Sequence, residues 1–291
     1  MHRLLLVGLT IALLSLSALG QGAPTLRIVT EDPTLPSDLF YGTARVKPLR
    51  LRPGTNTPIT IDDSDFFVQQ QYIDFLSRFP ESGGFAAWLN VLAGCNGDRN
   101  CLDGENGRRV EVSKSFFQSE EFQLKGYFVY RFYKASLGRQ PLYVEIIPDM
   151  RSVTGTTTAE VEQKRTAFSD AWVQRAEFLQ KYPTTLSPTA YVDGILQTAG
   201  ITVSNRAQLI ADLTSGAKTR AQVLRAIVES PEEFNKEYDP AFVAMQYFGY
   251  LRRDPEPEGY NNWLVYLAAH PGDYKHMVWG FAYSTEYRNR F

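Results

Sequence analysis

Apolar residues recur along the chain at spacings of three and four, the period of an α-helix that buries one face. Two such stripes follow each other between residues 67 and 93, and Pro80 separates them. Proline is tolerated only in the first turn of a helix, so it marks the break. The pattern predicts two amphipathic helices with their bulky residues in the core: Val68, Tyr72, Phe75, Leu76 and Phe79, then Phe85, Trp88, Leu89 and Leu92.

The same pattern returns near the end of the chain. Residues 67–93 and 242–268 align without a gap and are identical at 13 of 27 positions, which indicates an internal repeat. The identical pairs include Tyr72 and Tyr247, Arg78 and Arg253, Pro80 and Pro255, Gly84 and Gly259, and Trp88 and Trp263. Two diverged copies lie between them, and they open near Phe128 and Tyr191.

Each copy closes on a similar phrase, in which a glutamate precedes an aromatic residue. The four phrases are SEEF at 119–122, RAEF at 175–178, PEEF at 231–234 and STEY at 284–287. We therefore divide the chain into repeat one at 65–126, repeat two at 127–187, repeat three at 188–238 and repeat four at 239–291. Each repeat is predicted to hold about three helices and a closing turn, so the predicted fold class is all-α, a tandem array of helical repeats.

Repeats two and three are degenerate. In repeat two, a loop reaching Thr158 is expected in place of the second helix. Two helix starts are expected from capping patterns: Asp239 as an N-cap with Pro240 in the first turn, and Ser230 in a capping box with Glu233.

The region before the repeats differs in kind. Residues 1–20 combine a basic start, an apolar run and a small-residue cleavage pattern, which predicts a secretory signal peptide. A retained signal anchor is the alternative, although the run is short for a span of about 20 residues. Prolines and short alternation at 44–51 and 58–61 predict an extended arm over residues 21–64 with one or two short edge strands. The expected location is secreted, periplasmic or at the cell surface, with no transmembrane segment after signal cleavage.

Two cysteines, Cys95 and Cys101, lie in a polar loop at residues 94–107. In an oxidising compartment this pair predicts one local disulfide. Calcium binding is the alternative, because Asp98, Asp103 and Glu105 crowd the same loop. No EF-hand register fits, since Cys101 falls where that loop needs glycine.

An acidic turn in repeat four is the other candidate ion or ligand site, with Asp254, Glu256 and Glu258 close to a helix start. The structural alternative assigns Asp254 as the N-cap and the two glutamates to the positive end of the helix dipole, and lets Gly259 permit close packing. Repeat one keeps only one carboxylate in this turn.

Arginines recur at one register of the repeats, as Arg78, Arg139 and Arg253. We expect them to pair with acidic residues of a neighbouring helix rather than with a substrate.

Residue types argue against an enzyme. Apart from His2, the chain has only His270 and His276, with no further histidine or cysteine to complete a zinc site. No nucleophile elbow, P-loop or dinucleotide fingerprint is present, so we expect no catalytic, cofactor-binding or metal residues and no cofactor. The chain has 30 basic and 32 acidic residues, scattered along its length, which offers no electropositive footprint for nucleic acid.

The phrases LRRDPEPEGYNNW at 251–263 and SEEF at 119–122 resemble the bacterial domain of unknown function family 4214. That family occurs in many exported and surface-layer-like proteins, and its helical unit also looks related to the phycobilisome linker domain. The resemblance covers about residues 65–291 and is strongest in the first and last repeats. It implies a helical fold and an exported location, and it carries no established chemistry.

We expect a non-catalytic extracellular interaction or scaffold module, related to surface layers or adhesion, whose partners are other proteins or a surface polymer at the cell exterior. The alternative is a secreted carbohydrate-binding or carbohydrate-processing protein, in which exposed Tyr and Trp rings stack on sugars.

The disulfide gives the first testable prediction. Peptide mapping of the secreted protein by mass spectrometry should show Cys95 joined to Cys101 before reduction. Alkylation of both thiols without prior reduction would contradict this.

Overall fold

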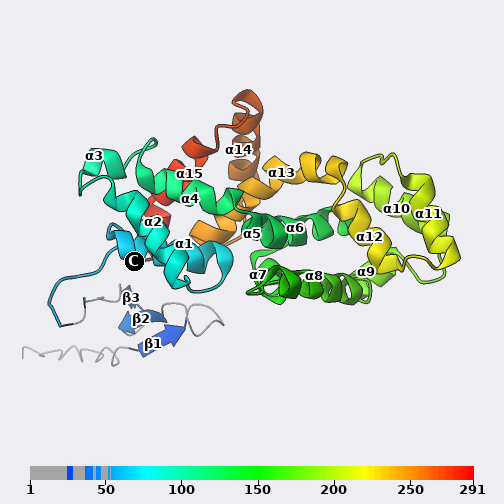
Figure 1. The fold of residues 1–291 in the computed structure, drawn as a ribbon, viewed down its shortest axis with the longest axis horizontal. Coiled ribbons are helices and arrows are strands. Elements are labelled where there is room, and N and C mark those ends of the chain that lie inside the picture. The colour runs from blue at the N-terminus through cyan, green and yellow to red at the C-terminus, as the bar shows by residue number, and fades with distance from the viewer. Residues whose placement is uncertain (1–24, 29–36, 42–43, 47–51, 53) are drawn as a thin grey trace, which may run out of the picture. The chain divides into compact units, whose positions relative to one another are not determined.

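The computed structural model describes residues 25–28, 37–41, 44–46, 52 and 54–291. The predicted signal peptide, residues 1–20, lies outside the described residues. The chain divides into two compact units, Met1–Leu49 and Arg50–Phe291 (Figure 1). We call them the sheet unit and the helical unit and describe each by itself.

The sheet unit holds three antiparallel strands: β1 (Thr25–Ile28), β2 (Ser37–Tyr41) and β3 (Ala44–Val46). They pair in the order β1-β2-β3, with Leu39 opposite both Leu26 and Val46. The alternating pattern at residues 58–61 predicts a short strand. These residues belong to the helical unit and form no strand.

The helical unit carries the repeats, and the predicted helical fold class is confirmed. Repeat one contains α1 (Ser64–Leu76), α2 (Ser82–Ala93), α3 (Arg99–Leu102) and α4 (Arg108–Gln118). A long helix made of α5 (Glu120–Phe122), η1 (Gln123–Tyr127), α6 (Phe128–Phe132) and η2 (Tyr133–Leu137) begins at the end of repeat one and continues into repeat two. Repeat two also contains α7 (Tyr143–Ser152) and α8 (Thr158–Trp172). The segments η1 and η2 are π-helical.

Helix α9 (Ala176–Lys181) lies at the end of repeat two, and repeat three contains α10 (Pro188–Ala199), α11 (Arg206–Ser215) and α12 (Arg220–Val228). Helix α13 (Pro231–Gln246) begins in repeat three and continues in repeat four into the π-helical η3 (Tyr247–Leu251). Repeat four also contains α14 (Pro257–Ala269), α15 (Tyr274–Ala282) and α16 (Thr285–Arg288). In the described part of the chain, no helix combines the length and the apolar character that crossing a membrane requires.

The closing phrases begin helices instead of ending them. The hydroxyl of Ser119 accepts a hydrogen bond from the backbone N–H of Phe122, and Ser230 and Ser284 cap α13 and α16 in the same way. The helix that starts after Ser119 then runs on as the first helix of repeat two, and the one after Ser230 as the first helix of repeat four.

The expected helix start at Asp239 and Pro240 is therefore wrong. Pro240 lies inside α13, because Ser230 already supplies the cap and Pro231 the first-turn proline. The carbonyl of Pro240 accepts a hydrogen bond from the Tyr260 hydroxyl at 3.1 Å. Helix α13 thus crosses the predicted boundary between repeats three and four.

The inserted loop predicted in repeat two is also wrong, because α7 occupies residues 143–152 as the second helix of that repeat. The sequence pattern concealed this helix in two ways. Pro148 lies inside it, and it lacks the glycine and tryptophan that mark its counterparts.

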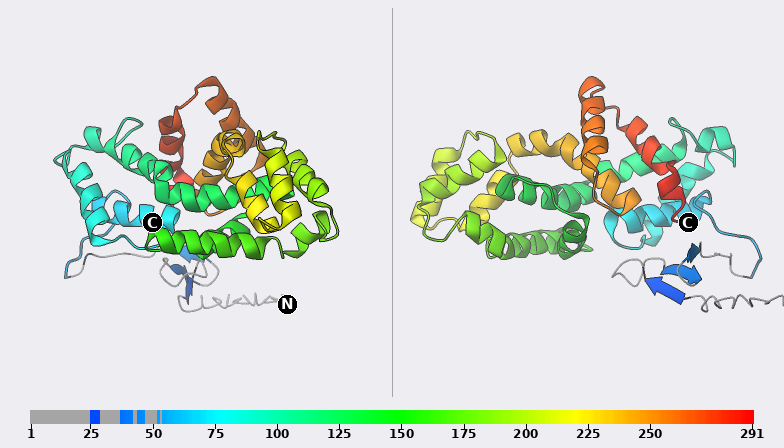
Figure 2. Two further views of the ribbon diagram at one scale, coloured as in Figure 1. Left: turned by 45° about the vertical axis from the view of Figure 1, so that its right-hand side comes forward. Right: turned by 180° about the vertical axis from the view of Figure 1, so that it is seen from behind.

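The first and last repeats pack directly against each other. In an open array each unit contacts only its neighbours. Here the ring of Phe75 lies 4.9 Å from that of Tyr250, and the ring of Phe117 lies 5.4 Å from that of Phe242. A Cβ on Gly249 would collide with the Phe75 ring, so glycine permits this close approach. Helix α4 lies beside α15, and α1 lies beside η3 (Figures 1 and 2).

A buried ion cluster joins the same two repeats. The Asp74 side chain of α1 is fully buried and accepts hydrogen bonds from Arg252 at 3.0 Å and from Arg290 at 2.8 Å. Arg290 also donates to the carbonyl of Tyr250 at 2.6 Å. Removing one partner of a buried pair leaves an uncompensated charge, which is far more costly than losing a surface pair.

We therefore expect Asp74→Asn to lower the free energy of unfolding by about 3 kcal/mol, because two largely buried guanidinium groups lose their counter-charge. Asp193→Asn is the control: Asp193 pairs with Arg206 on the surface, and its loss should cost less than about 1 kcal/mol. Urea unfolding followed by circular dichroism measures both. If both variants lost an equally small amount of unfolding free energy, this would contradict the role of Asp74 in holding repeat one against repeat four.

Candidate functional site

The recurring arginines each lie between two glutamates and over a tyrosine ring. In repeat one, Arg78 donates from Nε and Nη2 to Glu121 at 2.8 and 2.7 Å, and from Nη1 to Glu81 at 2.5 Å. Its guanidinium carbon lies 4.9 Å from the centre of the Tyr72 ring. We call this arrangement of tyrosine, arginine and two glutamates the arginine clamp.

The clamp occurs three times. In repeat two, Arg139 binds Glu145 and Glu177 over the Tyr133 ring. In repeat four, Arg253 binds Glu256 and Glu286 over the Tyr247 ring. The prediction that these arginines pair with acidic residues of neighbouring helices is confirmed.

Local backbone geometry positions each arginine. Each clamp arginine comes directly after a residue in the left-handed conformation, which ends the first helix of the repeat. These residues are Ser77, Gly138 and Arg252. Such a cap turns the chain sharply out of the helix. The arginine then reaches both the start of the second helix and the closing phrase, so one side chain ties three segments together.

Clamp formation changes the acidity of its glutamates. Hydrogen bonding to Arg139 lowers the pKa of Glu177. Burial alone would raise the pKa of Glu121, but hydrogen bonds from Arg78 and Lys125 outweigh it and lower that pKa. Both carboxylates therefore stay charged well into the acidic range.

The shared glycine of the acidic turn belongs to the clamp as well. A Cβ on Gly84 would collide with the Glu81 carboxylate and the Tyr72 hydroxyl. A Cβ on Gly259 would meet the equivalent atoms of Glu256 and Tyr247. This explains why glycine recurs where the sequence suggested close packing.

The three carboxylates of the predicted acidic site have separate surroundings. Asp254 accepts from the backbone N–H of Tyr143 in repeat two at 2.5 Å. Glu256 is the N-cap of α14 and belongs to the clamp, and Glu258 is exposed in the first turn. The expected N-cap role of Asp254 is wrong, because Glu256 is the N-cap and α14 begins at Pro257. Within the described residues no group of three histidine, cysteine or acidic side chains could hold a metal ion.

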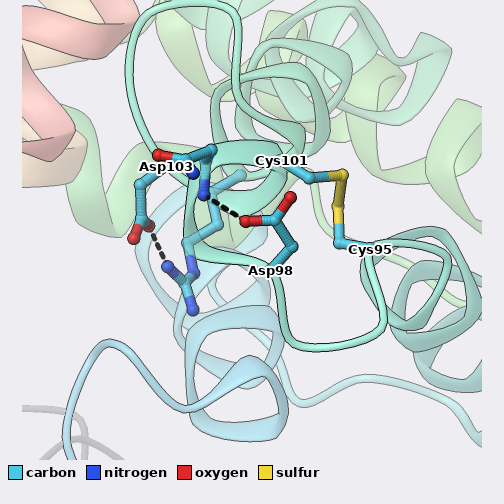
Figure 3. The surroundings of a disulfide bond; sticks show 6 residues. Cys95, Asp98, Cys101 and Asp103 are labelled. Carbon is cyan, nitrogen blue, oxygen red and sulfur yellow. Dashed lines mark hydrogen bonds and ion pairs between the residues drawn. A yellow bond between two sulfur atoms is a disulfide. The ribbon is translucent and has the colours of Figure 1, made fainter.

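The predicted disulfide between Cys95 and Cys101 is present, with a Cα–Cα distance of 5.5 Å (Figure 3). It encloses the start of α3, which Asp98 caps by accepting from the N–H of Asn100 at 2.9 Å. Asp103 pairs with the buried Arg109, as the second dashed contact of Figure 3 shows.

The disulfide loop also contacts the last repeat. Asp103 accepts from the Tyr283 hydroxyl at 2.9 Å, and the Glu105 carboxylate lies 3.2 Å from Nδ1 of His276. The acidic residues that suggested calcium thus contribute a helix cap, an ion pair and contacts across repeats.

Aromatic rings gather on α14 and α15 next to this contact. Tyr266 lies between His270 and His276, with ring centroids 4.4 and 4.8 Å away and nearly parallel planes. Trp263 and Trp279 flank His276 at 6.1 and 5.8 Å. We call these five residues the ring cluster. Except for the exposed His270, its members are half-buried.

The two equivalent tryptophans are less buried than the sequence predicts. Trp88 and Trp263 are half-buried and pack against the edge of the core, on Phe116 and Phe281 respectively. Of their helices, α2 buries only Leu92 fully and α14 only Leu267. These second helices lie at the periphery, which the repeat pattern alone could not reveal.

Repeat two lacks this tryptophan and has an ion pair instead. Arg175 donates to Asp149 at 2.6 and 2.9 Å and lies over the Trp172 ring at 4.2 Å. Together with Tyr133 and Arg139, these residues line a cavity of about 320 Å³. The charged side chains of the cavity bond to one another, and Arg139 and Glu145 also bond to the backbone of Gln140 and Leu142.

In a comparison with known families, residues 232–291 match the model of the family described as "Domain of unknown function (DUF4214)". The matched segment spans α13 to α16, so it begins with the closing phrase at the start of α13. No curated protein matches the chain significantly. No solved structure does so either.

Substitutions at two adjacent glycines of α2 test whether the clamp requires glycine at position 84. Gly84→Ala should lower the free energy of unfolding by about 1–3 kcal/mol, because the new methyl group overpacks the clamp. Gly83→Ala places a methyl group in open space and should raise stability by up to about 1 kcal/mol through helix propensity. Thermal and urea unfolding of both variants supply the comparison, and equal effects would refute the steric role of Gly84.

Proposed function

We propose that the protein is a non-catalytic interaction or scaffold module that acts outside the cell, at a surface layer or in adhesion. The observation that carries this proposal is the use of the recurrent charged residues. Their arginines and glutamates are consumed in clamps that hold the repeats together, which leaves no repeated charged group for a substrate.

The disulfide supports an extracellular location. Such bonds persist in oxidising compartments and are rare in the reducing cytosol. The bond lies in a polar surface loop, where it restrains a segment that contacts two repeats.

Features that differ between repeats are the candidate partner contacts, because the shared residues are needed to rebuild the fold. At the start of α7, Leu142 is 49% exposed and Val144 is 73% exposed. Isolated exposed apolar residues are common, but these two lie in one turn beside the clamp of repeat two. We assign this turn and the disulfide loop as the contact surface for another protein.

Carbohydrate binding is the second candidate, and the ring cluster favours it. By alignment, repeat one has Val91, Glu111 and Lys114 where repeat four has Tyr266, His276 and Trp279. The fold can therefore be built without these rings. Half-exposed aromatic rings beside carboxylates suit the stacking and hydrogen bonding that sugars require.

Exchanging the α7 turn tests the main proposal. Leu142→Ser with Val144→Ser should abolish binding of the mature protein to its cell-envelope fraction, while helical circular dichroism and melting stay unchanged. Val265→Ser, an equally exposed apolar site on α14, is the matched control and should bind normally.

A glycan array separates the two candidates. Glycan binding that is lost in Tyr266→Ala and kept in the α7 double variant would replace the main proposal by the carbohydrate one. Turnover of a polysaccharide or peptide by the pure protein would contradict both binding roles.

A further inference from the structure

Repeat three has lost the arginine clamp but kept one of its glutamates. The residue after its left-handed cap, Gly200, is Ile201 where the other repeats have arginine. The clamp tyrosine is replaced by Ile195. The closing phrase nevertheless retains Glu233, in the register of Glu121, Glu177 and Glu286.

Glu233 has become a buried carboxylate without a hydrogen-bonded partner. It is 0% exposed, and neither carboxylate oxygen has a hydrogen-bond partner within the described part of the chain. Glu237, one turn later on α13, is 4% exposed, and its Oε2 also lacks a hydrogen bond there. Such groups are rare in folded proteins, because burial removes the water that would solvate them.

Three cations lie around this pair; two of them approach Glu237 at long ion-pair distances, and none donates a hydrogen bond to Glu233. On α6, Arg131 donates from Nε to the carbonyl of Val228 at 2.9 Å. On η2, Lys134 stays 3.7 Å from Glu237, and on α13 itself Lys236 donates to the carbonyl of Ala199 and lies 3.8 Å from Glu237.

The remaining polar groups near the pair are also accounted for. Glu229, at the end of α12, is held by Arg165 and Arg225. The hydroxyls of Tyr130 on α6 and Tyr260 on α14 lie 3.3 Å from each other. Burial raises the pKa of both tyrosines, and the charge of Glu237 raises it further. No described group therefore supplies a hydrogen bond to the Glu233 carboxylate.

A proton satisfies this site better than any neighbouring side chain. It removes the buried charge and gives the carboxyl group an O–H to donate. Burial, and then the charge of Glu237, raises the pKa of Glu233 to about 7, and burial also raises the pKa of Glu237. In two intact clamps the pKa shifts the opposite way: burial would raise the pKa of Glu121, but the hydrogen bond from Arg78 outweighs it, and the hydrogen bond from Arg139 lowers the pKa of Glu177. Glu233 differs from both in being fully buried and in lacking the arginine.

We propose that Glu233 and Glu237 form a proton-binding site between α13, α6 and η2, and that release of the proton loosens the packing of these helices. The site lies where repeats two, three and four meet, so it couples the arrangement of the array to pH. This inference is independent of which partner the protein binds.

The direction follows from proton linkage. Below the unfolded pKa of 4.5 the carboxyl group of Glu233 is protonated in both states and has no effect on the folding constant. As the pH rises towards 7, the unfolded chain loses this proton while the folded chain keeps it, so stability falls until the folded group also ionises. Between pH 5.5 and 8.5, Glu233 alone should lower the folding constant about thirtyfold.

The test is urea unfolding of the mature protein and of Glu233→Gln at pH 5.5, 7.0 and 8.5. The ratio of the variant's folding constant to that of the wild type should rise about thirtyfold from pH 5.5 to 8.5. Glu177→Gln is the matched control in the same register: its carboxylate stays charged over this range, so its ratio should stay constant within about threefold. A constant ratio for Glu233→Gln would overturn the proposal.

Hydrogen exchange of the wild type keeps the proposal testable if Glu233→Gln does not fold. After correction for intrinsic exchange, protection of the α13 amides should fall at least tenfold between pH 5.5 and 8.5. Unchanged protection of α13 would count against the site.

Discussion

The arginine clamp is the constraint on which the repeat architecture depends. One guanidinium group lies on a tyrosine face and binds two carboxylates, one at the start of the second helix and one in the closing phrase. A partly exposed ion pair is worth little alone, but an arginine that makes three directed hydrogen bonds to two segments also fixes their geometry. It accounts for the fixed spacing of tyrosine and arginine in three repeats, and for the glutamate and glycine that follow them at the same spacing in repeats one and four.

Departures from the clamp mark where the repeats have acquired other properties. Repeat two keeps the clamp but replaces the tryptophan by the Asp149–Arg175 pair and leaves a cavity. Repeat three keeps only the glutamate, which is buried without its arginine. Repeat four keeps the whole motif and adds the ring cluster. The shared residues maintain the fold, and the differences distinguish one repeat from another.

Much of the helical unit could be predicted from periodicity and self-similarity, because helices and repeats are local features of a sequence. The pairing of Arg78, Arg139 and Arg253 and the disulfide were accessible for the same reason. The starts of helices were harder to predict. Asp239 and Pro240 have the residue types of an N-cap and a first helical position, but the helix already begins after Ser230. Pro148 concealed α7 in a similar way.

Contacts distant in sequence were not predictable. The packing of repeat one on repeat four depends on Asp74 meeting Arg252 and Arg290, and no spacing rule connects these positions. The half-exposure of Trp88 and Trp263 follows from the peripheral position of their helices, which is likewise a tertiary property. The unpaired state of Glu233 could have been suspected from the sequence, because repeat three has Ile201 at the position where the other three repeats have arginine.

A double-mutant cycle with Arg78→Met and Glu121→Gln, measured by urea unfolding, tests whether the recurrent arginines and glutamates stabilise the fold. We expect a favourable coupling energy of about 1–2 kcal/mol between the two side chains. A coupling energy indistinguishable from zero, with both single variants as stable as the wild type, would contradict it.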